Sequence, residues 1–412
     1  MRVLILSHST GQGGGSRVAY REFCALRSLG IEVELWVQHK DSNDEKIIAL
    51  EPVRNRLGAW GPRIIHRMGL DFCDIQKKSP NDLLKAITQR FDIVHVHALP
   101  GMGIIDLPAL SRSIPLVKTL HDMGSLTGNC IYPYACERWK TQCKQCPQFG
   151  EFPLHWLHRD SSFWVHRLRK WIYKRCAPSM HLIAVSDWLK SKVAASHLSR
   201  FPVTAIQNAV DTDAYYPVVK KKARERLGIP LQAKVVAFAV ASNPLDTRKG
   251  TDLILAAISR LKKEHLYFLP SCIGKGAERL ESLFDQHSIP HRKPQHFSTD
   301  EELRNFYNGA DVLWHPSRAD TSSLVSMEAM ACGTPVIAAA VGGVPEVVGD
   351  AGILIEPNNS EALVSATRGF FQEGAETRVN RREQCRSRAL ERFGMERFGR
   401  EHLDCFKSII EK

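Results

Sequence analysis

The stretch DVLWHPSRADTSSLVSMEAMACGTPVIAAAVGGVPE, residues 311–346, contains the pattern that decides the fold. It begins with a short apolar run at 311–317, passes through a polar loop into SLVSMEAMA at 323–331, and reaches a second apolar run at 334–340. Continuous apolar runs are typical of strands buried on both faces of a parallel sheet. A helix between two such runs therefore predicts a β-α-β unit with a right-handed crossover.

The same alternation extends along the whole chain. Further apolar runs lie at 1–7, 33–37, 92–98, 116–122, 181–186, 203–210, 234–242, 266–274 and 351–356. The polar, proline-containing stretch 215–230 divides them into two series. We predict an α/β protein with two doubly wound, Rossmann-like parallel-sheet domains, 1–215 and 216–395, facing each other across a cleft. Ligands of such sheets bind beyond the carboxyl ends of the strands.

Composition limits the functions that need to be considered. The 412 residues, 43% of them hydrophobic and 24% charged, are typical of a globular protein with two or more domains. A net charge of +12 favours anionic partners such as nucleic acid, acidic lipid or phosphorylated small molecules. No apolar run approaches the roughly 20 residues that span a bilayer, and residues 1–7 are too short for a signal peptide. We therefore expect a reducing, cytoplasmic setting for the 11 cysteines.

Two carboxylates eight positions apart, Asp320 and Glu328, frame an uncharged helix start. Carboxylates accept hydrogen bonds from the vicinal hydroxyls of a sugar or a ribose. Serine and threonine are preferred helix caps, and a helix start offers N–H groups to an anion. Those amides would come from Ser322, Ser323, Leu324 and Val325. The alternative is a capped helix with one internal salt-bridge acid.

Glycines follow the first expected strand in STGQGGGSR, where Gly13, Gly14 and Gly15 precede a helical pattern at 16–29. Without Cβ atoms, these residues let the backbone approach a ligand closely. Their spacing does not match the dinucleotide fingerprint, so an NAD site is disfavoured. The alternative to a phosphate-binding loop is a tight strand-to-helix turn.

Two cations, Arg248 and Lys249, precede Gly250 at an expected helix start in the second domain. There they could neutralise a diphosphate together with the helix dipole. The alternative is a solvated surface pair.

The stretch from Asp320 to Glu346 closely resembles the family-4 retaining glycosyltransferases of the GT-B fold. Their pattern is an acid, seven residues, a glutamate, and then AMA-G-PVIA---GG-PE. The first acid is usually Glu in the family, so Asp320 is one carbon shorter. The segments RKG at 248–250, SDWLK at 186–190 and NAVDTDAY at 208–215 also match. The resemblance covers nearly the whole chain, is nearest to bacterial polysaccharide-synthesis members, and implies a C-terminal helix, 396–412, that returns toward the N-terminal domain.

The resemblance also implies roles for individual residues. Glu328 would bind the ribose of the donor, Asp320 its sugar hydroxyls and Lys249 its diphosphate. The Gly13–Gly15 loop would lie near the donor phosphate and the acceptor, and His121 would face the donor sugar. His121, Lys249 and Asp320 are thus the expected catalytic residues, although a lone histidine is also compatible with a satisfied strand-end position.

The resemblance has one departure in the second domain. The family usually has an arginine five or six residues before the lysine, where this chain has Asn243 and Pro244. We expect Arg248 to substitute for it.

The implied activity is the transfer of a sugar from a UDP- or GDP-linked donor to a glycan or lipid-linked acceptor, with retention and without a catalytic metal. Its expected setting is cell-surface polysaccharide synthesis at the inner face of the membrane. A basic nucleic-acid-binding or membrane-binding protein is the alternative, but a carboxylate pair would repel a phosphate backbone. A sugar-nucleotide epimerase would share the fold and lack the 320–346 pattern.

Four cysteines, Cys130, Cys136, Cys143 and Cys146, lie in one segment after His121. Cys-x-x-Cys is a common half of a zinc site, and four thiolates complete a tetrahedral one. We therefore expect a structural zinc ion, with two disulfides or four packed reduced thiols as alternatives.

A basic, tryptophan-rich segment follows at 164–174. On a helix, one face would carry the apolar side chains and the cations would lie mostly elsewhere, which indicates a membrane-surface element. The alternative is a domain helix whose aromatic face is core. The apolar set is Trp164, Leu168, Trp171 and Ile172, and the cations are Arg167, Arg169, Lys170 and Lys174.

Overall fold

The computed structural model describes residues 1–11, 13–50, 81–100, 102–149, 160–240, 247–274, 277–286, 289–291, 297 and 299–411. The chain forms two compact units. The first consists of Met1–Asn208 together with Met395–Lys412, and the second of Ala209–Gly394. The division thus falls after Asn208 rather than after residue 215, and Met395 already belongs to the first unit. Asn243 and Pro244 lie outside the described residues.

The first unit contains a seven-stranded parallel sheet in the order β3-β2-β1-β4-β5-β6-β7. Each apolar run expected in the first half of the chain contains a strand. Sequence reasoning missed β3, which has three residues and follows a polar stretch. The strand order reverses between β1 and β4, so ligand-binding loops are expected beyond the carboxyl ends of these strands. The strands are β1 (Arg2–Ser9), β2 (Glu32–His39), β3 (Ile47–Ala49), β4 (Ile93–Val96), β5 (Leu116–Leu120), β6 (His181–Ala184) and β7 (Val203–Ala205).

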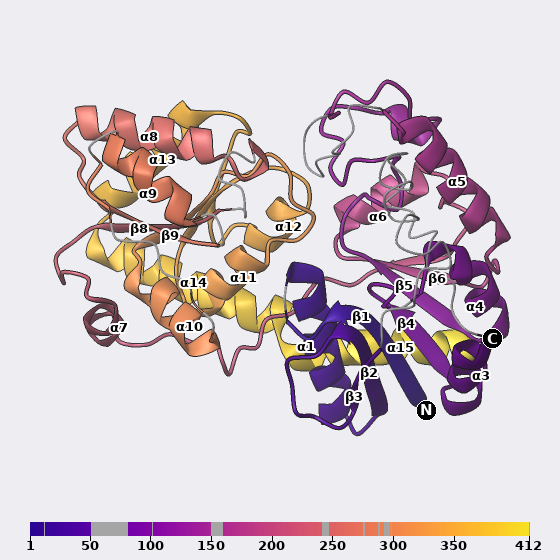
Figure 1. Ribbon diagram of the computed structural model, residues 1–412. Coiled ribbons are helices and arrows are strands. Elements are labelled where there is room, and N and C mark those ends of the chain that lie inside the picture. The colour runs from indigo at the N-terminus through magenta and orange to yellow at the C-terminus, as the bar shows by residue number, and fades with distance from the viewer. Residues whose placement is uncertain are drawn as a thin grey trace. The chain divides into compact units, whose positions relative to one another are not determined.

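Helices cover both faces of this sheet. Side chains of α3, α4, α5 and α6 share one buried core with Leu4 and Leu6 of β1. Helix α15 packs on α1, where a Cβ on Gly399 would meet the Ala25 carbonyl oxygen at 3.0 Å. Figure 1 shows α15 beside α1, with both chain ends on this unit. The helical segments are α1 (Gly14–Ser28), α3 (Asn81–Arg90), η3 (Ile104–Asp106), α4 (Leu107–Ser113), η4 (Arg138–Lys140), α5 (Ser162–Arg175), α6 (Asp187–Ala194) and α15 (Met395–Ile410).

The second unit contains a five-stranded parallel sheet in the order β12-β11-β10-β8-β9. Alternate residues of β8 enter two different cores, Val235 and Ala237 on one face and Val236 and Phe238 on the other. This alternation is the normal pleat of a strand buried on both faces. The order reverses between β8 and β10. The strands are β8 (Val235–Ala239), β9 (Leu269–Ile273), β10 (Val312–His315), β11 (Val336–Ala339) and β12 (Ile353–Ile355).

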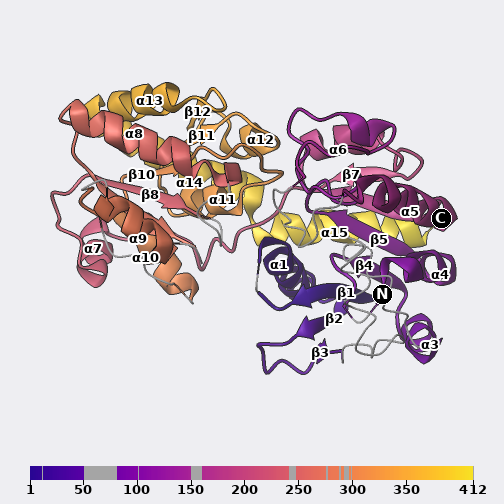
Figure 2. The ribbon, with the colours of Figure 1, turned by 45° about the horizontal axis from the view of Figure 1, so that its top comes forward.

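Helices α8, α9 and α13 share the core on one face of this sheet, and α10, α11, α12 and α14 share the core on the other. Figure 2 shows α8 and α13 side by side on the same face. Within the described parts of both units, no helix is long and apolar enough to cross a bilayer. The helical segments are α7 (Lys220–Leu227), η5 (Thr247–Lys249), α8 (Thr251–Lys263), α9 (Ala277–Gln286), α10 (Asp300–Gly309), α11 (Leu324–Ala331), α12 (Val344–Val348), α13 (Ser360–Gln372) and α14 (Ala375–Phe393).

Candidate functional site

Polar side chains gather where β8 and β10 end, on either side of the reversal in strand order. The Nζ atom of Lys249, in η5 after β8, lies 3.2 Å from Oδ2 of Asp320. The Nε2 atom of His315, the last residue of β10, lies 3.3 Å from the same oxygen. The loops after these two strands thus bring a cation, a carboxylate and an imidazole together.

The carboxyl group of Asp320 is buried and ionised. Burial opposes its ionisation, but the charge of Lys249 and the hydrogen bond with His315 outweigh burial and hold its pKa well below the usual range. Burial lowers the pKa of His315, so this imidazole is neutral at pH 7. The cluster combines one buried anion with one cation and one neutral donor.

Arg318 ties the two loops together. Its guanidinium donates to both carboxylate oxygens of Asp252 in α8, at 2.7 and 2.6 Å, and its backbone N–H donates to the Arg248 carbonyl at 2.7 Å. Bidentate pairs of this kind fix geometry as well as charge. Gly250 packs there too, since a Cβ on it would lie 2.3 Å from the Pro316 carbonyl oxygen. Sequence reasoning did not identify Arg318, because its partners are about 70 residues away.

Gly342 explains the glycine pair that follows β11. Its φ is +57°, and a Cβ on it would lie 1.9 Å from the backbone oxygen of Asp320. The Gly343 N–H donates to the same oxygen at 3.1 Å. The segment after β11 therefore supports the Asp320 backbone directly, and only glycine fits at 342.

The start of α11 lies next to Asp320. The Ser322 N–H donates to Asp320 Oδ1 at 3.2 Å, and the hydroxyl of Ser323, the N-cap residue, accepts from the Ser326 N–H at 3.2 Å. Leu324 and Val325 form the first helical residues and are partly exposed. The first N–H groups of a helix have no acceptor within the helix and attract anions. Arg248 and Lys249 belong to the adjoining η5 turn.

Glu328 lies deeper, in the interior of α11, with 2% of its surface exposed. Its Oε2 accepts a hydrogen bond from the Tyr307 hydroxyl of α10 at 3.0 Å. The Tyr307 backbone oxygen accepts in turn from the Thr334 hydroxyl at 2.8 Å. Tyr307 thus orients the carboxylate, and no pattern in the sequence pointed to it.

The glycines of the first unit differ from the expected loop. Gly13 has φ +90° and caps α1, but Gly14 and Gly15 form the first turn of that helix, which was expected to begin at Ser16. A Cβ on Gly15 would lie 3.1 Å from Cδ2 of His121. The small residue lets α1 approach the imidazole that follows β5.

A buried hydrogen-bond chain runs from α1 to His121. The Nε2 atom of His97 lies 2.7 Å from Glu22 Oε2, and His97 Nδ1 lies 2.9 Å from His121 Nε2. Burial opposes ionisation of Glu22, but the surrounding histidines hold its pKa well below the usual range. Burial lowers the pKa of His97 to about 4 and that of His121 also well below its usual value.

These protonation states fix the tautomers along the chain. An ionised carboxylate only accepts, so His97 carries its proton on Nε2 and accepts through Nδ1. His121 must then donate from Nε2, which leaves Nδ1 as its unprotonated nitrogen. The sequence singled out His121 alone. The Glu22–His97 partnership is formed by elements far apart in the sequence.

His95 binds the other oxygen of the same carboxylate. Its Nδ1 lies 2.6 Å from Glu22 Oε1 and its Nε2 lies 2.7 Å from the Thr119 hydroxyl. The ligand atoms of Glu22, His95 and His97 are close enough together to suit a metal ion. Direct hydrogen bonds account for this closeness, because both nitrogens of each ring already have partners.

The four cysteines of the expected zinc segment are free thiols around one small cavity. Cys130 and Cys143 are buried, and Cys136 and Cys146 are partly exposed.

Helix α5 combines features of the two alternatives drawn from its sequence. Trp164 and Trp171 are 64% and 50% exposed, whereas Ile172 is buried, so the expected apolar face is divided between solvent and core. Arg169, one of the cations expected mostly off the apolar face, is buried and donates to the carbonyls of Gly124, Thr127 and Gly128, the last two at 2.8 and 3.2 Å. The buried guanidinium thereby fixes the loop that follows His121.

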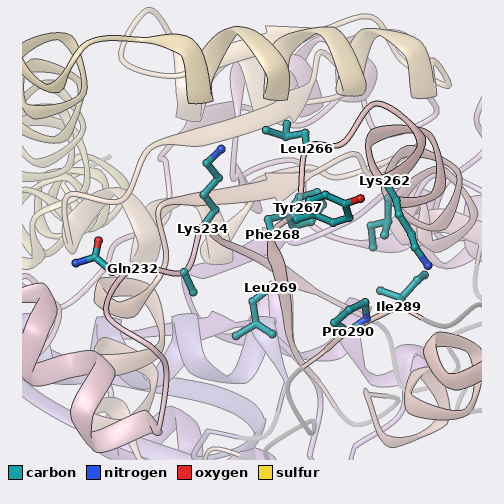
Figure 3. A pocket seen from close by; sticks show the side chains of 11 residues that line it. Gln232, Lys234, Lys262, Leu266, Tyr267, Phe268, Leu269, Ile289 and Pro290 are labelled. Atoms are coloured by element: carbon teal, nitrogen blue, oxygen red, sulfur yellow. The ribbon is translucent and has the colours of Figure 1, made fainter.

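A cavity of about 430 Å³ lies at the amino ends of β8 and β9 in the second sheet. Lys234, which precedes β8, and Phe268, which precedes β9, line it together with Lys262 and Tyr267 (Figure 3). Ligands of doubly wound sheets bind at the carboxyl ends of the strands. This cavity is therefore separate from the Asp320 site.

Both halves of the chain match known families. Residues 12–214 match the family described as "Glycosyltransferase Family 4", and residues 219–392 match "Glycosyl transferases group 1". A D-inositol 3-phosphate glycosyltransferase of Mycobacterium bovis is 35% identical over 359 residues, which cover 83% of this chain and 67% of the relative. One from Xylanimonas cellulosilytica is 26% identical over 437 residues, covering 98% of this chain and 94% of the relative.

Solved structures share the fold over nearly the full length. Anabaena Alr3699/HepE, solved in complex with UDP and glucose, gives a TM-score of 0.69 at 17% identity. The match covers 99% of this chain and 100% of that chain.

Proposed function

This chain belongs to the family 4 glycosyltransferases and has their GT-B fold, and on that premise we propose that it transfers a sugar from a UDP-linked donor with retention of configuration. The second unit binds the donor in this proposal. The solved relative that carries UDP and glucose supports this donor class.

One observation carries the proposal: Lys249, His315 and the start of α11 converge on Asp320. Lys249 and the N–H groups of Leu324 and Val325 supply positive potential at one edge of the sheet. These groups would stabilise a bound diphosphate most strongly as the glycosyl bond breaks, because negative charge then grows on the departing phosphate. Arg248 adds a second cation on the same turn.

Asp320 positions this machinery. Lys249, His315 and the Ser322 N–H hold its carboxylate in place. The carboxylate can therefore accept a hydrogen bond from a sugar hydroxyl while it keeps Lys249 in position. It is not the nucleophile in this proposal. Glu328, oriented by Tyr307, accepts hydrogen bonds from the ribose hydroxyls of the donor.

Retention follows from attack on the same face of the sugar. The bond between the anomeric carbon and the phosphate oxygen breaks, and its electron pair stays on the phosphate. The acceptor oxygen bonds to the anomeric carbon from that side, and its proton passes to the departing phosphate. His121 acts as a polar positioning group for the transferred sugar, through the Nδ1 that the Glu22–His97 chain leaves unprotonated. No step of this chemistry requires a metal.

We propose a lipid-linked glycan acceptor at the inner face of the cytoplasmic membrane, within cell-surface polysaccharide synthesis. The exposed side of α5 supports this location, since Trp164 and Trp171 alternate there with the exposed cations Arg167 and Lys174. Such a surface suits an anionic lipid headgroup region. The names of the curated relatives favour a second candidate acceptor, a phosphorylated inositol.

An assay of donor consumption distinguishes these proposals. The purified protein is incubated with UDP-sugars and GDP-sugars, first with lipid extract and then with inositol 3-phosphate. Release of UDP only with a lipid-linked acceptor supports the main proposal. Release only with inositol 3-phosphate supports the second candidate acceptor instead. The anomeric configuration of the product, read by NMR, tests retention. A product of inverted configuration would contradict the mechanism.

Two variants test the site and the location. Lys249→Met is expected to lower turnover severely, whereas Lys263→Met, at the exposed end of the adjoining helix, leaves it unchanged. The double variant Trp164→Ser/Trp171→Ser is expected to lose binding to anionic vesicles. Tyr267→Ser removes an equally exposed aromatic from the second unit and serves as the control. Equal vesicle binding by both variants would show that α5 does not contact the membrane surface.

A further inference from the structure

We propose that the segment after His121 binds one structural zinc ion through Cys130, Cys136, Cys143 and Cys146. The site shares no residue with the proposed donor site. The proposal rests on the arrangement of the four thiols, on the backbone that presents them and on the charges around them.

All four cysteines line a single cavity of about 10 Å³. That volume is about one water-sized sphere, so it suits a single ion. The Cys130 and Cys146 thiols are hydrogen-bonded to each other. With zinc–sulfur bonds of about 2.3 Å, a bound ion would draw Cys136 and Cys143 toward the Cys130–Cys146 pair.

The backbone is shaped to turn these thiols inward. Gln145, between Cys143 and Cys146, has φ +47°, and Tyr134, two residues before Cys136, has φ +49°. Non-glycine residues in this region are uncommon and cost of order 1–3 kcal/mol each. Only four such residues occur in the described chain, and two of them lie in this segment. An ion that bound all four thiols would offset this strain.

The backbone also donates to sulfur. The Gly128 N–H points at Cys143 Sγ at 3.3 Å. Gly128 cannot carry a side chain, because a Cβ on it would lie 2.3 Å from the Ser162 carbonyl oxygen.

Nearby cations suit a four-thiolate site. Four thiolates and one Zn²⁺ carry a net charge of −2, and Arg138 and Lys144 line the same cavity. The Arg138 guanidinium also donates to the carbonyls of Lys144 and Gln145, the former at 2.9 Å, so it holds the Cys143–Cys146 turn.

The ion would act on the loop and not in the reaction. Four thiolates close a tetrahedral site and leave no position for water or sugar. Met123, two residues after His121, donates its N–H to the Ile131 carbonyl at 3.1 Å, beside Cys130. Zinc would therefore fix the loop behind His121 together with buried Arg169, which holds the Gly124, Thr127 and Gly128 carbonyls.

Elemental analysis of the purified full-length protein tests the proposal. We expect about one zinc ion per chain. The amount of zinc released should rise in proportion to the number of site thiols that have reacted with an organomercurial, up to four per chain. Cobalt substitution should give the absorption bands of a tetrahedral thiolate site. Cys136→Ser and Cys146→Ser, the two partly exposed members, should lose the metal, whereas Cys24→Ser, outside the segment, should retain it.

Three outcomes would overturn the proposal. They are a zinc-free protein in which the thiols of these four cysteines react freely, disulfides between these cysteines in peptide mapping under non-reducing conditions, or zinc retained equally by the serine variants. Misfolding of a variant does not confuse the test, because the wild-type protein itself gives the metal content and the thiol count.

Discussion

At the scale of single residues, the site depends on pairs in which one group sets the state of another. Lys249 keeps the buried Asp320 ionised, Tyr307 orients Glu328, and Glu22 acts on His121 through His97. In each pair a buried polar group has a defined partner, so removing one member leaves the other uncompensated in a low dielectric. Substitutions at these residues should therefore affect function through their partners.

Replacing Glu328 by Gln is expected to weaken UDP binding. The amide keeps the shape of the side chain, but the lost charged hydrogen bonds to ribose are worth roughly 1.5–3 kcal/mol, or at least a tenfold rise in Kd. Calorimetric titration with UDP measures the change. Tyr307→Phe, which leaves the charge and removes only the orienting hydroxyl, should give a smaller loss. Wild-type affinity in the Gln variant would show that Glu328 does not bind the donor.

Replacing Glu22 by Gln should lower kcat and leave UDP affinity unchanged. The neutral amide can donate as well as accept, so it no longer forces the proton of His97 onto Nε2, and the His121 tautomer becomes mixed. Loss of one positioning hydrogen bond predicts a fall of about tenfold. Steady-state kinetics with UDP titration separate this effect from general damage. A rise in the Kd for UDP that matched the fall in kcat would indicate a structural role instead.

At the scale of elements, close backbone contacts build the proposed donor site. The turn after β11 presses on the Asp320 backbone through Gly342, and the start of α8 presses on the β10 loop through Gly250. Both glycines have positive φ, +57° and +69°. The carboxyl edges of β8, β10 and β11 are thus joined by direct backbone contacts, and this packing holds the start of α11 in place.

Two glycine-to-alanine substitutions in the second unit should have opposite effects. Gly342→Ala places a Cβ against the Asp320 oxygen and should destabilise the unit and abolish UDP binding. Gly369→Ala, at an exposed position in α13 with open space around it, should stabilise the unit by about 0.5–1 kcal/mol. Thermal unfolding with and without UDP measures both. A Gly342→Ala protein with wild-type stability would mean that the turn can move away from Asp320.

At the scale of the whole molecule, the two units differ in their buried histidines. Among the described residues of the first unit, burial lowers the pKa of six histidines, His95, His97, His121, His166, His197 and His402. In the second unit the same is found for His315. Neutral buried histidines penalise protonation of the folded state.

The first unit should therefore lose stability as the pH falls from about 6.5 toward 4. The folded pKa of His97 and of His166 is about 4, below the ordinary 6.5, so in this range the unfolded chain takes up protons that the folded unit excludes. Calorimetry across this pH range should show an unfolding transition of the first unit that falls faster than that of the second.

His197→Phe gives the matched control for acid sensitivity. Burial lowers the pKa of His197 to about 3, and neither ring nitrogen has a hydrogen-bond partner, so phenylalanine removes a protonation site at little cost. The variant should resist acid better than the wild type. Parallel loss of stability in both units, unchanged by His197→Phe, would contradict the assignment of acid sensitivity to buried histidines.

The layout of both sheets, and the segment 320–346 on which the proposed donor site depends, can be identified from the sequence alone. Continuous apolar runs that alternate with helix-length segments indicate a parallel sheet with helices on both faces, so eleven of the strands in the described residues could be located and the short β3 was missed. The 320–346 segment also predicted its own local structure, because strand, cap, helix and glycine turn are encoded by neighbouring residues.

Only the tertiary structure decided which distant groups become partners. Arg318 with Asp252, Tyr307 with Glu328, and Glu22 with His97 come from separate elements, and no periodicity relates their positions. The same holds for α5, where packing exposed Trp164 and Trp171 and buried Arg169 under three carbonyls. The physical reason is that apolar spacing specifies which face of an element can be buried, whereas the choice among buried polar partners depends on distances set by the assembled sheet.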